Sequence, residues 1–125
     1  MREYILDVAR YWLEEGFDGF RLDYAYGPPF DFWVDFRRAC RKVKPACWIF
    51  GEVVHSADIQ RAFSGVMDGT LDFLLARALR EMIAFEHMSL ADFESFLSMH
   101  ETFFPAEFSR PAFLDNHDMS RFLYT

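Results

Sequence analysis

The sequence predicts an α/β fold in which parallel strands alternate with helices. Segments with helical periodicity alternate with short apolar runs along the 125 residues, an order typical of parallel strands joined by crossover helices. The runs are almost continuously apolar, as strands covered on both faces are, and three of them lead into the carboxylates Asp23, Glu52 and Asp118. These observations leave two arrangements open, a doubly wound sheet and an arc of a barrel.

The first elements expected are a helix at residues 3–15 and a strand at residues 17–22. Apolar residues recur at helical spacing through the first segment, and Gly16 follows it as a C-terminal cap. The strand leads into a loop at residues 24–29, where a Gly-Pro-Pro sequence excludes regular structure.

Asp31 is expected to cap a helix that runs to about residue 43, where Lys-Pro stops it. A second apolar strand is expected at residues 46–50. After a short helix at residues 58–63, a third strand is expected at residues 66–73, although acidic residues and a glycine reduce its β-propensity.

The C-terminal third is expected to contain two helices and one more strand. Residues 74–85 have a strong helical pattern, and Ser-Leu-Ala-Asp at residues 89–92 resembles a capping box for a helix to about residue 103. A fourth strand is expected at residues 111–114, followed by the start of a helix through Arg121. No repeat or low-complexity linker separates a second domain, so we expect one domain.

Composition excludes several classes of partner. The net charge is −7 and the pI is near 5.0, so the chain has no electrostatic footprint for nucleic acid or a membrane surface. No apolar run is long enough to span a membrane, and the first residues lack the apolar core of a signal peptide, which slightly favours the cytoplasm and leaves the location open. Cys40 and Cys47 lack the spacing of a zinc site or a redox motif and are expected to be buried thiols.

Arg21 and Asp23 lie two residues apart, so on a strand their side chains point to the same side. A guanidinium beside a carboxylate favours the ionised form of that carboxylate, which suits a nucleophile. A purely structural Arg–Asp pair is the alternative.

Glu52 is expected at the end of the neighbouring strand, because the stretch from Asp23 to Glu52 fits a loop, a helix and a returning strand. Neighbouring strands lie about 4.8 Å apart, close to the separation of roughly 5 to 5.5 Å between the carboxyl groups of retaining glycosidases. The preceding Phe-Gly gives apolar surroundings that raise the cost of ionisation, as a general acid needs. A surface glutamate after a turn is the alternative.

The Asn-His-Asp sequence after the expected fourth strand supplies a third group. His117 can donate a hydrogen bond to a sugar hydroxyl, and Asp118 can accept one or stabilise an oxocarbenium-like transition state. For this sequence alone, a helix cap is the alternative. All three signals follow strands, at the end where barrel enzymes carry their chemistry.

Three segments carry a resemblance to a known family. They are GFDGFRLDYAYGPP (residues 16–29), WIFGEVVH (residues 48–55) and FLDNHD (residues 113–118). In this order they resemble the second, third and fourth conserved motifs of the alpha-amylase family, glycoside hydrolase family 13. The resemblance implies a partial TIM (β/α)8 barrel that covers about the fourth to seventh strands with their intervening helices.

By this resemblance Asp23 corresponds to the catalytic nucleophile, Glu52 to the general acid/base and Asp118 to the transition-state stabiliser. Arg21 matches the arginine beside the nucleophile, and His117 matches the substrate-binding histidine. The implied function is that of a retaining glycoside hydrolase acting on alpha-1,4-linked glucans or maltooligosaccharides.

Other interpretations stay open beside this one. A transglycosylase, isomerase or sucrose-type enzyme of the same family shares the three carboxylates, and a non-catalytic amylase-like interaction subunit shares the barrel. A flavodoxin-like sheet that binds phosphate is not favoured, because no Gly-rich loop follows any expected strand.

Two positions depart from the family pattern. Tyr26-Gly27 replaces a common Lys-His pair, whose histidine helps to hold a structural calcium and whose lysine contacts sugar. The resemblance therefore implies no certain cofactor. A structural calcium is possible in the parent enzyme, but Gly27 occupies the position of its usual histidine ligand. Val54 replaces a tryptophan that is common in relatives acting on small maltodextrins.

The resemblance also implies that much of the barrel lies outside residues 1–125. The family's first motif, its first three strands and its eighth strand have no counterpart in the sequence, and a complete barrel needs about 250 residues. We therefore expect a fragment of a single catalytic barrel domain, without its N-terminal and C-terminal parts, that is aggregation-prone and inactive in isolation.

Overall fold

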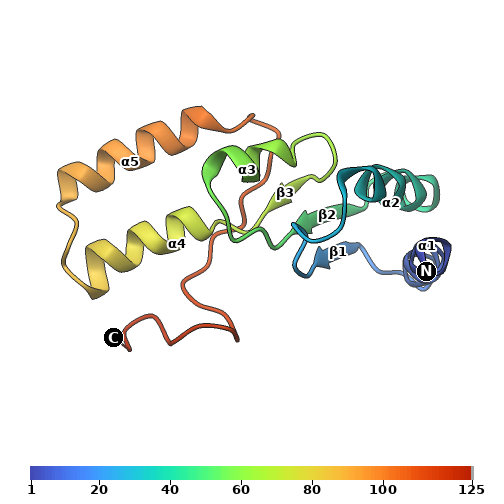
Figure 1. The fold of residues 1–125 in the computed structure, drawn as a ribbon, viewed down its shortest axis with the longest axis horizontal. Helices are drawn as coiled ribbons and strands as arrows, with labels where there is room; N and C mark the ends of the chain where they lie inside the picture. Colours follow the sequence, from blue (N-terminus) through green and yellow to red (C-terminus); the bar gives the residue numbers. More distant parts are fainter. Residues whose placement is uncertain (125) are drawn as a thin grey trace.

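A three-stranded parallel sheet lies at the centre of the computed structural model, which describes residues 1–124. The strands β1 (Gly19–Leu22), β2 (Trp48–Gly51) and β3 (Gly69–Thr70) lie side by side in chain order (Figure 1). The register pairs Leu22 with Gly51, and Gly51 with Thr70. The predicted parallel α/β architecture is thus confirmed, although β3 is much shorter than expected.

Five α-helices accompany the sheet in the described part of the chain. They are α1 (Arg2–Glu14), α2 (Phe30–Val43), α3 (Ala57–Ala62), α4 (Phe73–Leu79) and α5 (Leu90–Phe103). A π-helical turn, η1 (Arg80–Ala84), continues α4. The pair α1 and α2 lies at one end of the long axis, and the pair α4 and α5 lies at the other (Figure 1). None of these helices is both long and apolar enough to cross a membrane.

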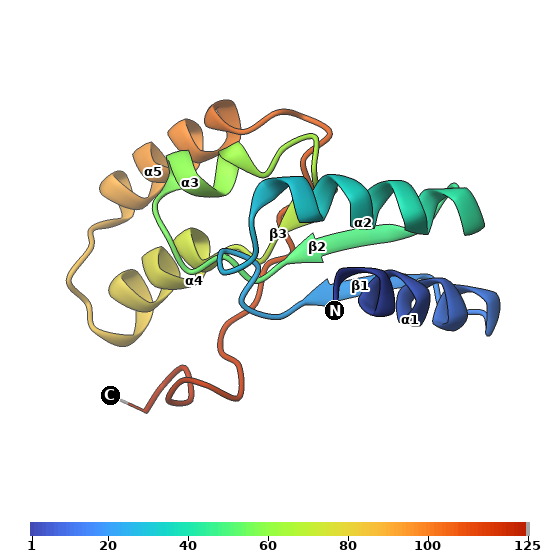
Figure 2. The ribbon, with the colours of Figure 1, turned by 45° about the vertical axis from the view of Figure 1, so that its right-hand side comes forward.

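The main core forms where α1 and α2 pack against the strands (Figure 2). The apolar stripe of α2 contributes three aromatic rings, because Phe32, Trp33 and Phe36 recur at helical spacing and are buried. The indole N–H of Trp33 donates a hydrogen bond of 2.9 Å to the carbonyl of Ala25. The core therefore anchors the loop that follows β1.

Asp68 is the main polar link between α2 and the sheet. Its side chain is 15% exposed and accepts hydrogen bonds from Arg37 (2.5 Å) and Arg41 (2.7 Å), both on α2. Its second carboxylate oxygen accepts the backbone N–H of Ile49 in β2 at 2.9 Å. One carboxylate thus ties the helix to the central strand.

Several local predictions are confirmed. Gly16 follows α1 with a φ of 104°, the left-handed conformation expected of a glycine at a helix C-terminus. Ser89 caps α5 by accepting the N–H of Asp92 at 3.2 Å, and the Ser89 hydroxyl donates to the Asp92 carboxylate at 2.6 Å. The helix expected to run through residues 74–85 starts as predicted but changes to the π-helical turn η1 after Leu79.

The prediction that Asp31 caps α2 is wrong. The N-cap residue is Pro29, and Asp31 lies inside the first turn without capping it. The carboxylate of Asp31 instead pairs with Arg2 of α1 at 2.7 Å, and the guanidinium lowers the pKa of this carboxyl. A partner from the neighbouring helix therefore replaces the local backbone partner.

The expected fourth strand at residues 111–114 is also not formed. Pairing with β3 begins earlier, where Ser109 donates to the Asp68 carbonyl (2.8 Å) and accepts from the Thr70 N–H (3.1 Å). The next ladder bond would need an N–H at position 111, and Pro111 has none. The pairing is therefore an isolated bridge, followed by one further bond from the Asp72 N–H to the Pro111 carbonyl at 3.1 Å.

No helix forms through Arg121 in the described residues; the chain there makes turns. In a helix the N–H of Phe122 would bond to the carbonyl of Asp118. It bonds instead to the side chain of Asp115 at 2.9 Å. Short acidic side chains compete with helical hydrogen bonds in this way, so the prediction of a helix is wrong.

Candidate active site

Asp23 and Glu52 come directly after β1 and β2, at the C-terminal ends of two adjacent parallel strands. Backbone hydrogen bonds continue past the strand ends, since the Glu52 N–H donates to the Leu22 carbonyl (2.8 Å) and the Ala25 N–H donates to the Glu52 carbonyl (2.9 Å). The two carboxylates are therefore held as neighbours by the backbone, as the sequence predicted.

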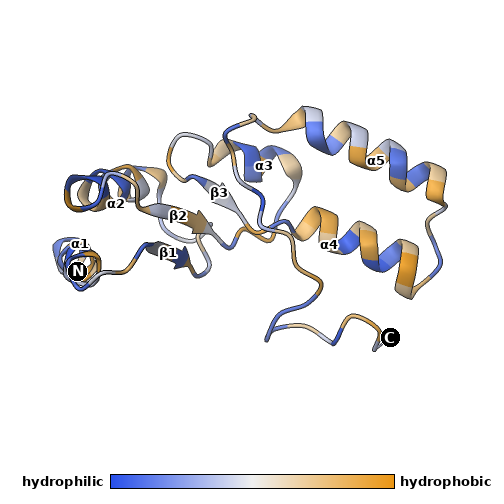
Figure 3. Ribbon diagram, turned by 180° about the vertical axis from the view of Figure 1, so that it is seen from behind, coloured by the Kyte–Doolittle hydropathy of each residue, from blue (hydrophilic) through white to orange (hydrophobic). Residues whose placement is uncertain are grey.

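Arg21 joins these two carboxylates, and we call the three residues the strand-end site. One guanidinium nitrogen of Arg21 pairs with Asp23, and the other pairs with Glu52 at 2.8 Å. The sequence predicted only the contact with Asp23. The contact with Glu52 follows from the register, which places Arg21 beside Phe50, two residues before Glu52. Figure 3 shows the hydrophilic part of β1 beside the apolar β2.

The two carboxylates differ in exposure. The side chain of Asp23 is 74% exposed, whereas that of Glu52 is only 11% exposed. Asp23 is thus open to an incoming ligand, and Glu52 lies in a sheltered position beside it. Two carboxyl groups in unlike surroundings are suited to unlike chemical roles.

Tyr24, the residue after Asp23, has an unusual backbone conformation and directs its N–H toward Glu52. Its φ is 42°, which is uncommon for a residue other than glycine and is often found near functional sites. Its N–H points to the side chain of Glu52, with a donor–acceptor distance of 3.4 Å. A side chain at Gly27 would meet the Tyr24 ring, because an added Cβ would lie 2.6 Å from it.

Gly51 lets the loop after β1 approach the base of Glu52. A Cβ at this position would lie 2.7 Å from the Met67 sulfur and 2.9 Å from the Ala25 Cβ. Both distances are shorter than ordinary van der Waals contact, so the close packing under Glu52 requires glycine.

His117 and Asp118 lie on a separate segment, residues 115–124, which we call the C-terminal segment. Their side chains are 72% and 63% exposed, and they pair with each other at 3.3 Å. Within residues 1–124, no hydrogen bond or ion pair connects either side chain with the strand-end site. The segment leaves the sheet and passes beside α4 (Figure 1). The structure therefore brings together Arg21, Asp23 and Glu52, but not the other two predicted residues.

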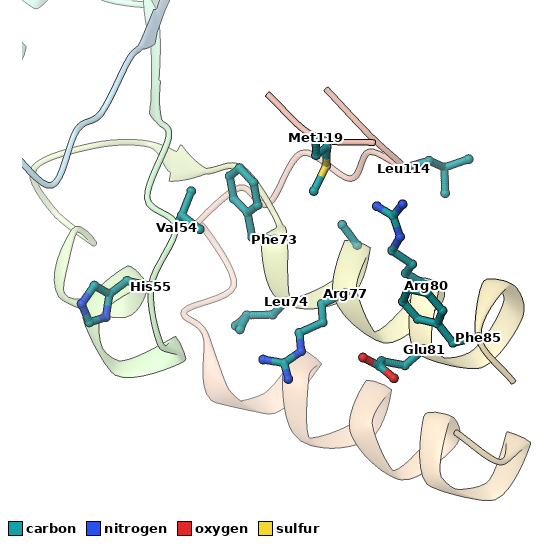
Figure 4. A pocket seen from close by; sticks show the side chains of 11 residues that line it. Val54, His55, Phe73, Leu74, Arg77, Arg80, Glu81, Phe85, Leu114 and Met119 are labelled. Atoms are coloured by element: carbon teal, nitrogen blue, oxygen red, sulfur yellow. The ribbon is translucent and has the colours of Figure 1, made fainter. Parts of the chain in front are cut away.

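A cavity of about 470 Å³ is lined by residues that lie close in sequence to both groups of predicted residues, although none of the five predicted residues lines it. Val54 and His55, which come two and three residues after Glu52, line one side of the cavity (Figure 4). Leu114 and Met119, which flank the sequence Asp-Asn-His-Asp, line the other side. The volume is within the usual range of small-molecule sites. This cavity could not be predicted from the sequence, because α4 supplies much of its wall through tertiary packing.

An aromatic ring lies beside the cavity wall. Tyr26, one of the two departures from the family pattern, packs its ring against that of His55 with centroids 4.9 Å apart. His55 also accepts the N–H of Ser56 at 3.0 Å through its Nδ1 atom. Tyr26 therefore presents a ring, instead of a lysine ammonium, next to the loop that follows Glu52.

A metal ion is bound by several ligand groups that lie close together. Among residues 1–124, no three His, Cys, Asp or Glu side chains gather closely enough to hold one. Gly27 supplies no ligand atom from a side chain, and the space next to it is filled by the Tyr24 ring. Gly27 therefore supplies no side-chain ligand for the structural calcium that the sequence resemblance left open.

The two cysteines are buried free thiols, as predicted. Burial raises the pKa of Cys40 to about 12 and also raises the pKa of Cys47. Both thiols therefore stay protonated near neutral pH, and neither is suited to act as a nucleophile.

Comparison with known proteins gives matches over the whole chain. The family model described as Alpha amylase, catalytic domain, matches residues 1–125. Alpha-amylase 2 of Dictyoglomus thermophilum is 36% identical over 123 residues, which are 98% of this chain and 22% of that protein. The cyclomaltodextrinase of Geobacillus thermopakistaniensis is 35% identical over 98% of this chain and 21% of its own length. The chain thus spans about a fifth of the length of these relatives.

Solved structures match in the same way. The cyclic alpha-maltosyl-(1→6)-maltose hydrolase from Arthrobacter globiformis superposes with a TM-score of 0.84 at 28% identity, over 91% of this chain and 26% of that one. The alpha-amylase from Geobacillus thermoleovorans, complexed with acarbose, gives a TM-score of 0.84 at 31% identity, over 97% of this chain and 28% of that one. These neighbours are TIM-barrel enzymes, so the three strands form an arc of a barrel and not a doubly wound sheet.

Proposed function

Since the chain belongs to the alpha-amylase family of glycoside hydrolases, whose catalytic-domain model matches residues 1–125, we propose that it carries the central catalytic groups of a retaining glycosidase. The substrate class is alpha-1,4-linked glucans or maltooligosaccharides. The observation that carries this proposal is the strand-end site, in which Arg21 contacts both Asp23 and Glu52 at the ends of adjacent strands.

In the first proposed step Asp23 acts as the nucleophile. A carboxylate oxygen of Asp23 forms a bond to the anomeric carbon while the bond from that carbon to the glycosidic oxygen breaks. Glu52 gives its proton to the departing oxygen. The high exposure of Asp23 and the sheltered position of Glu52 support this division of roles.

In the second step Glu52 acts as the base. It takes a proton from water, the water oxygen bonds to the anomeric carbon, and Asp23 leaves with its electron pair. Adjacent strands lie about 4.8 Å apart, and two carboxyl groups roughly 5 to 5.5 Å apart favour this double displacement. An inverting reaction would need more room, because a water molecule must fit between the carboxyl groups.

The remaining predicted residues have supporting roles in this proposal. Arg21 orients Asp23 and Glu52 relative to each other, because it pairs with the Asp23 carboxylate and its other N–H can still donate to the carbonyl oxygen of a protonated Glu52. Asp118 stabilises positive charge at the anomeric carbon, and His117 donates to a sugar hydroxyl. The cavity lined by Val54 and His55 on one side and by Leu114 and Met119 on the other is the part of the substrate path that we propose near these residues.

The activity is proposed for a longer protein that contains this chain, since the chain spans only 22% of Alpha-amylase 2. In the described structure β1 forms an edge of the sheet, and the large apolar side chain of Trp48 on β2 is exposed. An open edge and exposed apolar groups promote association with other chains. We propose that residues 1–125 in isolation are inactive.

The test is to replace each carboxylate in the full-length enzyme. Glu52→Gln is expected to lower kcat on maltooligosaccharides by roughly 10²- to 10⁴-fold, and Asp23→Asn is expected to abolish formation of the glycosyl-enzyme intermediate. Azide should restore turnover of Glu52→Gln with an activated substrate, giving a glycosyl azide of retained configuration. Asp18→Asn is the matched control, because Asp18 lies at the opposite end of β1 and, among the described residues, its side chain pairs with Lys44 alone.

The anomer formed first distinguishes the mechanisms. NMR of fresh wild-type product should show the α-anomer, as retention requires. A first-formed β-anomer, or near-wild-type turnover in either carboxylate variant, would contradict the proposal.

A further inference from the structure

We infer that Arg80 is a positioning residue that holds the C-terminal segment, and with it Asp118, in place for catalysis. The inference rests on the role proposed above for Asp118. Arg80 is the first residue of η1 and is half-buried beside the cavity. Its side chain points to the same side as Leu114 and Met119 (Figure 4).

The guanidinium of Arg80 donates to three backbone carbonyls of the segment. The acceptors are Ser120 at 3.3 Å, Arg121 at 3.0 Å and Tyr124 at 3.2 Å. Within residues 1–124, these are the hydrogen bonds that connect the segment with the rest of the chain. One side chain on η1 thus fixes a stretch that lies about 40 positions away in the sequence.

The other polar contacts of the segment are internal. Asp115 accepts the Phe122 N–H at 2.9 Å and the Arg121 guanidinium at 2.7 Å, and these two donors lower its pKa. The Asp118 N–H donates to the Asn116 side chain at 3.0 Å. Such contacts fix the shape of the segment but not its position relative to the sheet. Among the described residues, the hydrogen bonds that tie the segment to the rest of the chain come from Arg80.

The π-helical turn helps to orient the Arg80 side chain. The Phe85 N–H bonds to the Arg80 carbonyl at 3.0 Å, which is the i to i+5 bond of a π-turn. The turn places the Phe85 ring beside the Arg80 guanidinium, whose central carbon lies 5.8 Å from the ring centroid. A guanidinium over an aromatic face is stabilised, so its orientation toward the carbonyls is maintained.

Position matters because a transition-state stabiliser works only within a narrow geometry. A misplacement of about 1 Å can cost roughly 10²-fold in rate. If the segment carries the stabilising carboxylate, loss of the hydrogen bonds from Arg80 should therefore reduce the rate of the chemical step more than the binding of substrate.

The experiment compares Arg80→Ala with Arg38→Ala in the full-length enzyme. We expect Arg80→Ala to lower kcat by roughly 10- to 100-fold while KM changes by no more than about twofold. Arg80→Lys should recover only part of the rate, because an ammonium cannot span three carbonyls as a planar guanidinium does. Arg38 is the control, since it lies on the exposed face of α2 and its guanidinium, within residues 1–124, makes a polar contact with Asp35 alone, at 3.4 Å.

Limited trypsin digestion reports on the segment directly. Cleavage after Arg121, quantified by mass spectrometry of the folded enzyme, should be severalfold faster in Arg80→Ala than in Arg38→Ala. Each of these variants removes one trypsin site, so their digests are comparable. If Arg80→Ala fails to fold, Arg80→Gln, which also lacks a trypsin site at position 80, provides the same two measurements.

The inference is overturned if kcat of Arg80→Ala stays within about twofold of wild type, or if kcat falls without faster cleavage after Arg121. Asp118→Asn separates this result from failure of the proposed function. A fully active Asp118→Asn enzyme refutes the proposed role of Asp118. An inactive Asp118→Asn enzyme with an active Arg80→Ala enzyme refutes only the role of Arg80.

Discussion

The strand-end site and the C-terminal segment carry different parts of the proposed machinery and are held by different contacts. Arg21, Asp23 and Glu52 lie on or next to paired strands, whose backbone hydrogen bonds fix their positions. His117 and Asp118 lie on a segment that one arginine of η1 connects with the rest of the described chain. Backbone pairing thus positions the proposed nucleophile and acid/base, whereas side-chain hydrogen bonds position the proposed stabiliser.

The two regions also differ in what lies beneath them. Ala25 and Val53, which follow the strand-end carboxylates, are completely buried in the main core. The side chains of His117 and Asp118 are largely exposed. Substitutions under the strand-end site should therefore lower the stability of the fold, whereas substitutions in the C-terminal segment should change geometry and activity.

The largest effect on the strand-end side is expected from Asp68→Ala. This change leaves Arg37 and Arg41 without their shared acceptor and removes the acceptor of the Ile49 N–H. Breaking a largely buried ion pair by removing one partner costs about 3–5 kcal/mol. The melting temperature of the full-length enzyme should fall more than in any other variant described.

Asp18→Ala is the matched control for this comparison. Asp18 also pairs with a cation, Lys44, but its side chain is fully exposed to solvent, and the pair is screened. Its removal should leave the melting temperature almost unchanged. Equal melting temperatures for the two variants would contradict the view that the polar link of α2 to the sheet stabilises the strand-end site.

A smaller effect is expected from Gly51→Ala. The added Cβ would lie too close to the Met67 sulfur and the Ala25 Cβ, and overpacking of this kind costs about 1–3 kcal/mol. Because Ala25 belongs to the loop after Asp23, kcat should fall together with stability. Thermal unfolding and steady-state kinetics of the full-length enzyme measure both quantities.

The double variant Gly51→Ala, Met67→Ala sharpens this prediction. Removing the Met67 side chain relieves one of the two collisions, so the effects of the two substitutions should not add. Strict additivity of the melting-temperature changes would show that the collision does not determine the effect.

Sequence reasoning was most successful where structure depends on local pattern. The apolar spacing of α1 and α2, the glycine at position 16 and the Ser89 cap are each determined by residues within a few positions. The neighbouring positions of Asp23 and Glu52 could also be predicted, because the order of parallel strands and crossover helices leaves few alternatives.

The wrong predictions concern residues whose hydrogen-bond or ion-pair partners lie far away in the sequence. Asp31 pairs with Arg2 of another helix, and the expected strand after position 110 fails because Pro111 cannot donate to a strand about 40 residues earlier. Neither partner can be read from the local sequence. The contact of Arg21 with Glu52 was missed for the same reason, since it depends on the register of two strands.

The smallest effect is expected in the C-terminal segment, from protonation of Asp115. The Phe122 N–H and the Arg121 guanidinium lower the pKa of Asp115 below its ordinary value of 3.8. A depressed pKa in the folded state means that the stabilising contribution is present above pH 3.8 and is lost as the pH falls through the lower, folded-state value. The segment should therefore loosen only in strong acid.

Hydrogen–deuterium exchange of a peptide containing residues 115–124 can measure this loosening in the full-length enzyme. After correction for intrinsic exchange rates, protection of the Phe122 amide should fall on acidification below pH 3.8 in the wild type. Asp115→Asn keeps an acceptor oxygen but cannot titrate, so its corrected protection should not depend on pH in this range. The same acidic step should leave the amides of Ala25 and Glu52 protected, because backbone carbonyls, not carboxylates, accept their hydrogen bonds. Simultaneous loss of protection in both regions would show that they form one unit, held by the same contacts.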